Sequence, residues 1–174
     1  MVRRTLEEYA RGEHLSLSVV ERESGRGIGR VGLRGLDGKW RKVESLSYWM
    51  DPGHGGQGLA TETSWFLCRE AFQRLGVRRI SSSALDRNAA SLAVLRKLGF
   101  VEEGRERQAV VVKGRAMDMV LFGLFRKELV PWRTLARGRG PPPCAGAQGR
   151  PPPADLARSA CRKPPKGQHA FERP

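Results

Sequence analysis

The sequence predicts a mixed α/β domain with a mostly antiparallel, twisted sheet around one central parallel strand pair. Residues 15–50 alternate between apolar and polar side chains and contain no helical segment, which is typical of antiparallel strands joined by tight turns. Residues 41–84 indicate a strand, a glycine-rich loop, a helix and a second strand, the order that joins two parallel strands. Ten of the eleven prolines lie from Pro131 onward, so the folded domain is expected to end near that residue.

The segment before the glycine-rich loop is expected to hold one helix and three strands. Residues 1–12 show helical spacing of their apolar side chains and end at a glycine. Residues 15–22 and 28–36 form a hairpin around a turn of Ser, Gly and Arg residues. A second turn at Asp37-Gly38 leads into residues 41–50, the third strand of this meander and the one that enters the loop.

Two helices and three strands are expected after the loop. Residues 60–75 form an amphipathic helix, and residues 78–84 form a strand parallel to the strand before the loop. Residues 88–98 form a second helix, and residues 108–112 and 115–124 form a closing hairpin. Both helices end at a glycine. The helical residues expected to face the core are Trp65, Leu67, Cys68, Ala71, Phe72, Leu75, Leu92, Leu95 and Leu98.

The glycine-rich loop predicts an anion site. Gly55, Gly56 and Gly58 have no Cβ, so the backbone can approach a bulky anion closely. The first turn of the following helix adds unpaired N–H groups and the positive end of the helix dipole. A Walker loop requires Lys followed by Ser or Thr after its last glycine, whereas Leu59 and Ala60 stand here. A dinucleotide fingerprint lacks a well-placed acidic residue about 20 positions further on.

A third phosphate loop fits better. Residues 55–60, Gly-Gly-Gln-Gly-Leu-Ala, resemble the pyrophosphate loop of the GCN5-related N-acetyltransferases, which begins with Gln or Arg, with Gly55 at that first position. Residues 86–91 and 95–100 resemble the second cofactor-contacting segment of this family, especially the branch that acetylates the N-termini of ribosomal proteins. Residues 48–52 are similar to the strand end that precedes the loop in that branch. The resemblance covers residues 15–126 and implies a sheet whose parallel strands splay apart for coenzyme A.

The resemblance implies that acetyl-CoA is the cosubstrate and indicates which residues would contact it. Backbone amides near Met50 would bind pantetheine or the thioester carbonyl, Asn88 would support the pantetheine arm, and Ser91 would protonate the leaving thiolate. Ordinary helix capping is the alternative for Asn88 and Ser91. The residues expected to hold the pyrophosphate, mainly through their amides, are Gly55, Gly56, Gln57, Gly58, Leu59 and Ala60.

The sequence offers no well-placed general base. The Glu that many family members carry on the strand before the loop aligns here with Ser45. Glu44 is adjacent, but strand alternation directs it to the opposite face, so it could serve only after a bulge or register shift. His54 lies in the phosphate loop, away from the expected position of the acetyl group. A water chain, or an acceptor amine with a low enough pKa, would remove the need for a dedicated base.

Two functions from different classes follow. The first is an acetyl-CoA-dependent N-acetyltransferase that acts on a protein N-terminus, a lysine or a small-molecule amine. The alternative is a catalytically silent acyl-CoA-binding or ribosome-associating module, which Ser45 and Gly55 favour. A plain nucleic-acid binder would rest on the net charge of +14 alone, because the sequence has no recognisable reading helix or stacking aromatics.

Composition divides the chain into residues 1–130, the acetyltransferase-like domain, and residues 131–174, a disordered tail rich in Pro and Arg. The tail carries nine Lys or Arg against two acidic residues, a net charge of +7. A weak, salt-dependent contact of the tail with ribosomes or nucleic acid is one interpretation, and a merely solvated tail is the favoured one. Family members usually carry a strand and one or two helices before this start, so either the start codon is wrongly placed or the first strand is absent and the domain is shortened. An absent strand would expose a sheet edge for a partner, such as a second copy in a homodimer.

The N-terminus has no signal peptide and the chain has no apolar run long enough for a membrane span, so a cytoplasmic location is expected. Cys68, Cys144 and Cys161 are an odd number without the paired spacing of metal ligands. Neither a disulfide nor a metal site is expected from them.

Overall fold

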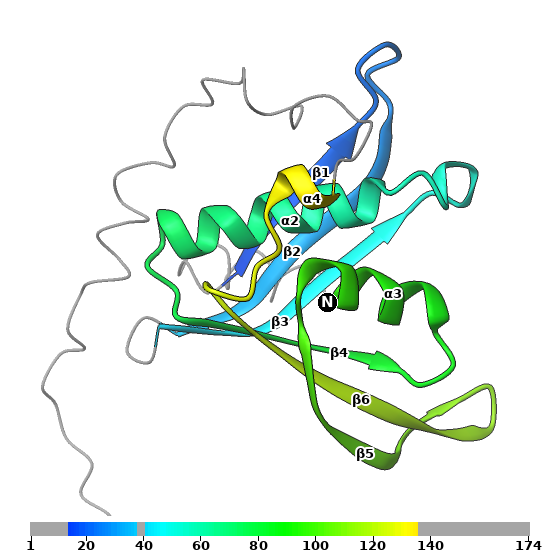
Figure 1. Ribbon diagram of the computed structural model, residues 1–174. Coiled ribbons are helices and arrows are strands. Elements are labelled where there is room, and N and C mark those ends of the chain that lie inside the picture. The colour runs from blue at the N-terminus through cyan, green and yellow to red at the C-terminus, as the bar shows by residue number, and fades with distance from the viewer. Residues whose placement is uncertain (1–13, 38–40, 136–174) are drawn as a thin grey trace, which may run out of the picture.

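One six-stranded sheet organises the protein (Figure 1). The computed structural model describes residues 14–37 and 41–135, so the expected N-terminal helix, Gly38 and most of the expected tail lie outside the described residues. The strand order is β1-β2-β3-β4-β6-β5, and all neighbours are antiparallel except the β3–β4 pair. This confirms the predicted fold class. The strands are β1 (His14–Val20), β2 (Gly27–Asp37), β3 (Lys42–Met50), β4 (Arg79–Leu85), β5 (Val101–Val112) and β6 (Arg115–Phe125).

Two helices cover one face of this sheet and contact each other (Figure 1). They are α2 (Leu59–Gln73) and α3 (Ala89–Leu98), each followed by the predicted glycine in a left-handed conformation, Gly76 with φ 63° and Gly99 with φ 97°. A short helix α4 (Trp132–Leu135) follows β6, and a 3-10 turn η1 (Pro52–His54) lies between β3 and α2. No helix in the described ranges is both long and apolar enough to cross a membrane.

The core lies between these helices and the sheet. Paired residues of neighbouring strands, such as Leu33 with Leu46 and Ser82 with Phe122, are buried on the same face. The helical core residues predicted from spacing are all buried except Leu75, which is half-buried against the same cluster. The sheet therefore has one packed face, against which the site is built.

The parallel strands β3 and β4 are paired over only a short stretch. Their register contains Lys42 with Arg79 and Val43 with Ile80 and extends no further in the described residues. Beyond these pairs the Ser82 hydroxyl donates a hydrogen bond of 3.0 Å to the Leu46 carbonyl, so a side chain replaces the backbone ladder. The two strands then diverge (Figure 1). We call the diverging parts, residues 46–50 of β3 and 82–85 of β4, the fork.

Strict alternation along β3 is broken just before the fork. Val43 and Leu46 are both buried although they are three residues apart, so the residues between them interrupt the period of two. Opposite this point on β2, Gly35 has φ 62°. The simple alternation expected through Glu44 and Ser45 is therefore wrong.

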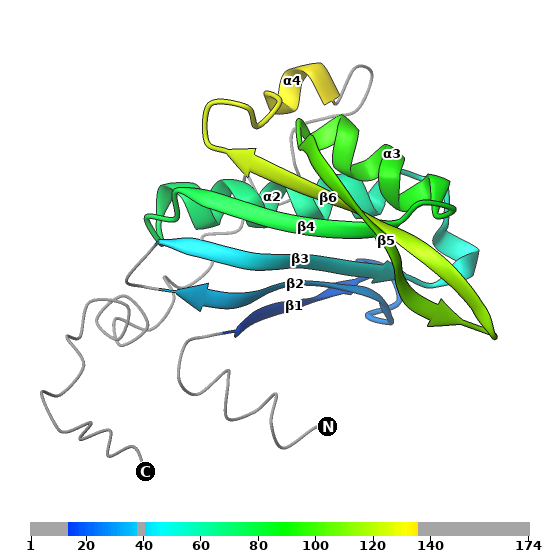
Figure 2. The same ribbon diagram turned by 90° about the horizontal axis from the view of Figure 1, so that it is seen from below.

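The β5–β6 hairpin is longer than predicted. The expected strand over residues 108–112 begins at Val101, because Glu102, Gly104, Arg105 and Glu106 also pair with β6, although most residues of this stretch are exposed. The ladder is irregular between Glu106 and Val110, where Gln108 has φ 51° and its amide donates to Asp118 at 2.9 Å. Figure 2 shows the tip of the hairpin extending past the end of β4.

Candidate active site

The glycine-rich loop leaves β3 at Met50 and enters α2 at Leu59. Asp51 caps η1, and its side chain accepts a hydrogen bond of 3.1 Å from the Gly53 amide. Gly56 with φ 74° and Gly58 with φ 80° are both left-handed, and Gly58 is the N-cap of α2. These backbone angles, which side chains rarely allow, are the reason the loop needs glycine at both positions.

The loop and the first turn of α2 present main-chain donors. The amide of Glu62 donates to the Gly58 carbonyl at 3.0 Å and begins the helix ladder, so the amides of residues 59–61 precede it. A Cβ built on Gly56 would meet no atom within 4 Å, so the space above this residue is open. Open space, glycine backbone and a helix N-terminus together suit a diphosphate group.

The turn between β1 and β2 contacts the loop through two side-chain pairs, which we call the turn contacts. Arg26 forms an ion pair of 2.9 Å with Asp51, and Nε2 of His54 lies 3.5 Å from the Glu21 carboxylate. The pKa of Glu21 is held below its ordinary value, first by the Ser24 hydroxyl and then by His54. The structure thus places His54 in a loop-holding contact rather than at the fork.

The main chain of β3 faces the fork at alternate residues. The Leu46 carbonyl points toward β4, because it accepts from Ser82 there, whereas the Asp51 amide points to β2 and donates to Ile28 at 2.8 Å. By alternation, the N–H and C=O groups of Tyr48 and Met50 also point toward β4. No β4 partner for these two residues is among the described strand pairs, so the predicted Met50 main-chain site lies at an unpaired edge.

The start of α3 brings the two predicted helix residues together. Asn88 is the N-cap, and its side chain accepts a hydrogen bond of 3.1 Å from the Ser91 amide, so the capping role is observed. The Ser91 hydroxyl lies 2.9 Å from the hydroxyl of Tyr48, which also donates to the Ser91 carbonyl at 3.2 Å. Burial raises the pKa of Tyr48 above its ordinary value, although the Ser91 hydrogen bond opposes this.

Glu44 is not brought to this pair. A Cβ built on Gly35 of β2 would lie 2.6 Å from Cγ and Oε2 of Glu44, so the Glu44 side chain lies over β2. Along β3, Tyr48 lies four positions after Glu44, a rise of about 13 Å. The break in alternation therefore occurs, but the carboxylate is exposed and remote from Ser91.

Sequence reasoning did not single out Tyr48, although the matched segment 48–52 contains it. Its contact with Ser91 joins residues 43 positions apart, and it depends on how α3 packs over the sheet. The pattern of one strand carries no signal for such a pair, so only the three-dimensional structure assigns it.

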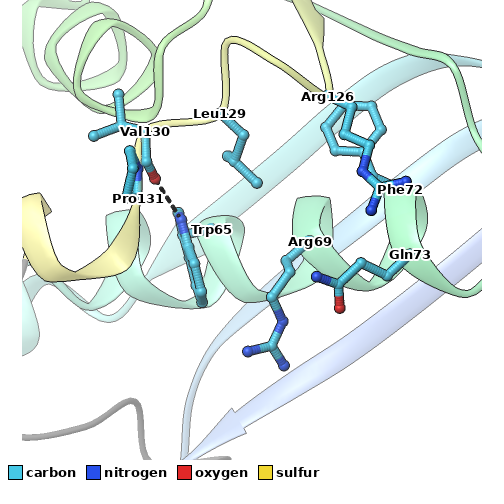
Figure 3. A pocket seen from close by; sticks show the side chains of 8 residues that line it. All are labelled: Trp65, Arg69, Phe72, Gln73, Arg126, Leu129, Val130 and Pro131. Atoms are coloured by element: carbon cyan, nitrogen blue, oxygen red, sulfur yellow. Dashed lines mark hydrogen bonds between the residues drawn. The ribbon is translucent and has the colours of Figure 1, made fainter.

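A hollow of about 180 Å³ lies elsewhere, between the later turns of α2 and the segment after β6 (Figure 3). Trp65, Arg69 and Phe72 line its helix side. The Trp65 indole donates to the Val130 carbonyl at 2.8 Å, which fastens the segment after β6 to α2. The lining residues of α2 lie about two to four turns beyond Leu59, so the hollow is separate from the glycine loop and we assign it a structural role.

Comparison with known proteins identifies a family. The family described as acetyltransferase (GNAT) domain matches residues 1–101. The candidate ribosomal N-acetyltransferase YdaF of Bacillus subtilis (strain 168) is 34% identical over 100 residues, which cover 58% of this chain and 54% of YdaF. The uncharacterized N-acetyltransferase p20 of Bacillus licheniformis is 29% identical over 117 residues, covering 67% of this chain and 65% of p20. The chain thus spans about half to two thirds of the length of these relatives.

Solved structures share the fold. Mycobacterium smegmatis RimJ in complex with CoA-disulfide has a TM-score of 0.69 and 26% identity, with coverage of 79% of this chain and 66% of RimJ. Vibrio cholerae spermidine N-acetyltransferase with CoA and spermine has a TM-score of 0.67 at 20% identity, covering 73% of this chain and 74% of that enzyme, and shows the fold alone. With its parallel pair forked beside a glycine loop and a family match over residues 1–101, the chain belongs to the GNAT acetyltransferase domain family.

Proposed function

We propose that the protein is an acetyl-CoA-dependent N-acetyltransferase, which transfers an acetyl group to an amine by direct attack of the amine on the thioester. The observation that carries this proposal is the fork, whose unpaired main-chain edge lies between the glycine loop and Ser91. The diphosphate of acetyl-CoA would bind at the glycine loop, and its pantetheine arm would run along β3 toward Ser91.

The roles of the residues follow from their atoms. The amides of Gly56 and of residues 58–60 would donate to the diphosphate. The Gly55 amide, also predicted as a donor, already donates to the Pro52 carbonyl at 3.2 Å. The main chain of Tyr48 and Met50 would bind the pantetheine arm and polarise the thioester carbonyl. Asn88 keeps the first turn of α3 in place and would contact pantetheine, and Ser91 would donate a proton to the departing sulfur. Acetyl-CoA supplies the activated acyl group.

Glu44 carries no step in this proposal, because its carboxylate lies over β2. The acceptor ammonium would lose its proton to water before attack. Positioning the two reactants can supply a large part of the rate acceleration, since well-oriented reactants reach effective molarities on the order of 10⁵ M or more. A slow but measurable turnover at neutral pH is therefore expected, rising with pH as more of the amine is free.

A protein N-terminus is the acceptor we put first. YdaF and RimJ, at 34% and 26% identity, are more similar to this chain than the spermidine enzyme at 20%. An N-terminal α-amine also has a pKa of about 7.7 to 8.0, so it loses its proton without a strong base. Lysine and polyamine acceptors, with higher pKa values, are expected to react more slowly.

Two measurements test the proposal. Isothermal titration with acetyl-CoA should show saturable binding, and thiol release in the presence of peptides with free N-termini should exceed the rate without peptide. Gly58→Val should weaken acetyl-CoA binding by about 30-fold, or about 2 kcal/mol, and slow thiol release at a fixed acetyl-CoA concentration. Gly114→Val, which alters a left-handed glycine in the distant β5–β6 turn, should retain both. A folded sample that does not bind acetyl-CoA would contradict the proposal.

A catalytically silent acyl-CoA-binding module is the second candidate. Gly55, where the resembled loop carries Arg or Gln, and the distance of Glu44 from Ser91 favour it. Saturable acetyl-CoA binding without thiol release from a broad panel of peptides and amines would support the silent module over the enzyme.

A further inference from the structure

The contact between Tyr48, in the β3 part of the fork, and Ser91 joins β3 to α3. The Tyr48 hydroxyl lies 2.9 Å from Ser91 Oγ and 3.2 Å from the Ser91 carbonyl oxygen, so both contacts compete for the single Tyr48 proton. Tyr48 is half-buried, and Ser91 is half-buried in the first turn of α3. The proposed function uses the proton of the Ser91 hydroxyl. The position of the Tyr48 proton decides whether the Ser91 proton can reach the sulfur.

Two arrangements of the protons satisfy these distances. In the first, Tyr48 donates to the Ser91 carbonyl, and Ser91 Oγ–H donates to Tyr48, so the Ser91 proton is withheld from the fork. In the second, Tyr48 donates to Ser91 Oγ, and the Ser91 proton is free to point at a sulfur atom. Only the second arrangement lets Ser91 act as an acid.

We propose that Tyr48 is a positioning residue that acts through Ser91, aiming its proton and replacing it during acyl transfer. This inference rests on the proposed function. As the C–S bond breaks, the sulfur takes both bonding electrons and then the proton of Ser91 Oγ. Ser91 Oγ takes the proton of the Tyr48 hydroxyl, and the tyrosinate takes a proton from water. The hydroxide left by that water takes up the proton that the acceptor nitrogen loses on acylation, so the net change is the transfer of one proton from the acceptor nitrogen to the thiolate.

The weak acidity of serine explains why a second hydroxyl group is needed to supply the proton. A serine hydroxyl is a very weak acid, so it releases its proton to a thiolate only if the resulting alkoxide is reprotonated at once. Tyr48 is the stronger acid and already lies at hydrogen-bonding distance. Burial raises its pKa, so Tyr48 holds its proton at neutral pH and is ready to donate. The Cys68 thiol beside it is buried, its pKa is also raised, and it remains neutral.

The test compares Tyr48→Phe, Ser91→Ala and the double variant with the wild type, using acetyl-CoA and a peptide with a free N-terminus. We expect Tyr48→Phe and Ser91→Ala each to lower kcat by about 10²-fold, the usual size of a proton-transfer contribution, with KM for acetyl-CoA changed less than about threefold. The double variant should be no slower than Ser91→Ala alone, because Tyr48 acts only through Ser91. Ser47→Ala, which removes a hydroxyl facing β2 on the same strand, should keep the wild-type kcat.

The outcomes separate this inference from the proposed function. If kcat of Tyr48→Phe is within twofold of the wild-type kcat, the inference is overturned and the proposed function is not. The same holds if the reductions in kcat caused by Tyr48→Phe and Ser91→Ala multiply in the double variant. A wild type that releases no thiol with any amine would overturn the proposed function and the inference with it. If Tyr48→Phe does not fold, kcat of the wild type in H₂O–D₂O mixtures decides: a curved dependence supports two moving protons, and a linear one overturns the relay.

Discussion

The glycine loop and the fork lie at the two ends of one candidate binding path, but they are built from different parts of the chain. At the loop, the groups proposed to bind the ligand are main-chain amides, and Gly56 and Gly58 have left-handed backbone angles. At the fork, side chains set the geometry: Ser82 bridges to Leu46, and Tyr48 meets Ser91. The loop should therefore tolerate changes of side chain and fail when its backbone angles change, whereas the fork should respond to the loss of one hydroxyl.

The largest effect is expected from Gly58→Val. A residue with a Cβ is strained at φ 80° by about 1–2 kcal/mol, and a β-branched side chain is among the worst choices. The loop would relax to other angles and turn the first amides of α2 away from the ligand. We expect acetyl-CoA affinity to fall by about 30-fold, or about 2 kcal/mol, in a calorimetric titration.

Gly114→Val is the control for strain in general. Gly114 has φ 74° in the β5–β6 turn, so its substitution costs similar stability far from the loop. An equal loss of acetyl-CoA affinity in both variants would show that strain alone weakens binding and would contradict the backbone-built loop.

A smaller effect is expected at the fork from Ser82→Ala. Ser82 is 6% exposed, and its hydroxyl is the link between β3 and β4 just beyond their last backbone pair. Its removal takes a hydrogen-bond partner from the Leu46 carbonyl, a loss of about 1 kcal/mol or somewhat more in the free energy of unfolding. Urea denaturation would measure it, with the exposed neighbour Ser83→Ala as control. Equal stability of the two variants would show that the Ser82 bridge does not hold the fork.

The contrast between the locally built loop and the fork, which depends on long-range contacts, explains how much of the structure the sequence could predict. The loop, its glycines and the helices that follow depend on local chemistry, so the inward leucines of α3 were predicted correctly from their spacing. Capping by Asn88, which the structure shows, was the alternative to its pantetheine contact. The fork depends on long-range contacts. The Tyr48–Ser91 pair needs α3 to be placed over β3, and the start of β5 at Val101 needs its partner β6, because residues 102–107 show no apolar alternation. The break between Val43 and Leu46 likewise depends on β2 and β4 together.

Gly55→Arg tests the tolerance of the loop in the opposite direction. Gly55 has φ −65°, which any residue adopts, and a Cβ there would meet only the Pro52 carbonyl at 3.2 Å, so a small adjustment accommodates it. The added guanidinium would form a charge-assisted contact with the diphosphate. We expect about threefold tighter acetyl-CoA binding in calorimetry, with a gain that shrinks at high salt. Weaker binding would show that the loop also depends on side-chain identity.

The smallest effect is expected from Glu21→Gln, which weakens one turn contact without touching either end of the binding path. The pKa of Glu21 is lowered by Ser24 and His54, so its contacts stabilise the fold above the ordinary carboxyl pKa and are lost as pH falls through the lowered value. The variant should be slightly less stable than wild type at pH 6, and the two should converge as pH falls below the ordinary carboxyl pKa and through the lowered pKa of Glu21. Urea denaturation across this pH range measures the difference, with the exposed neighbour Glu23→Gln as control. Because only a side chain outside the loop is altered, acetyl-CoA affinity should change less than about twofold; a larger loss would show that the loop amides depend on the turn contacts and that the loop is not held by its own backbone alone.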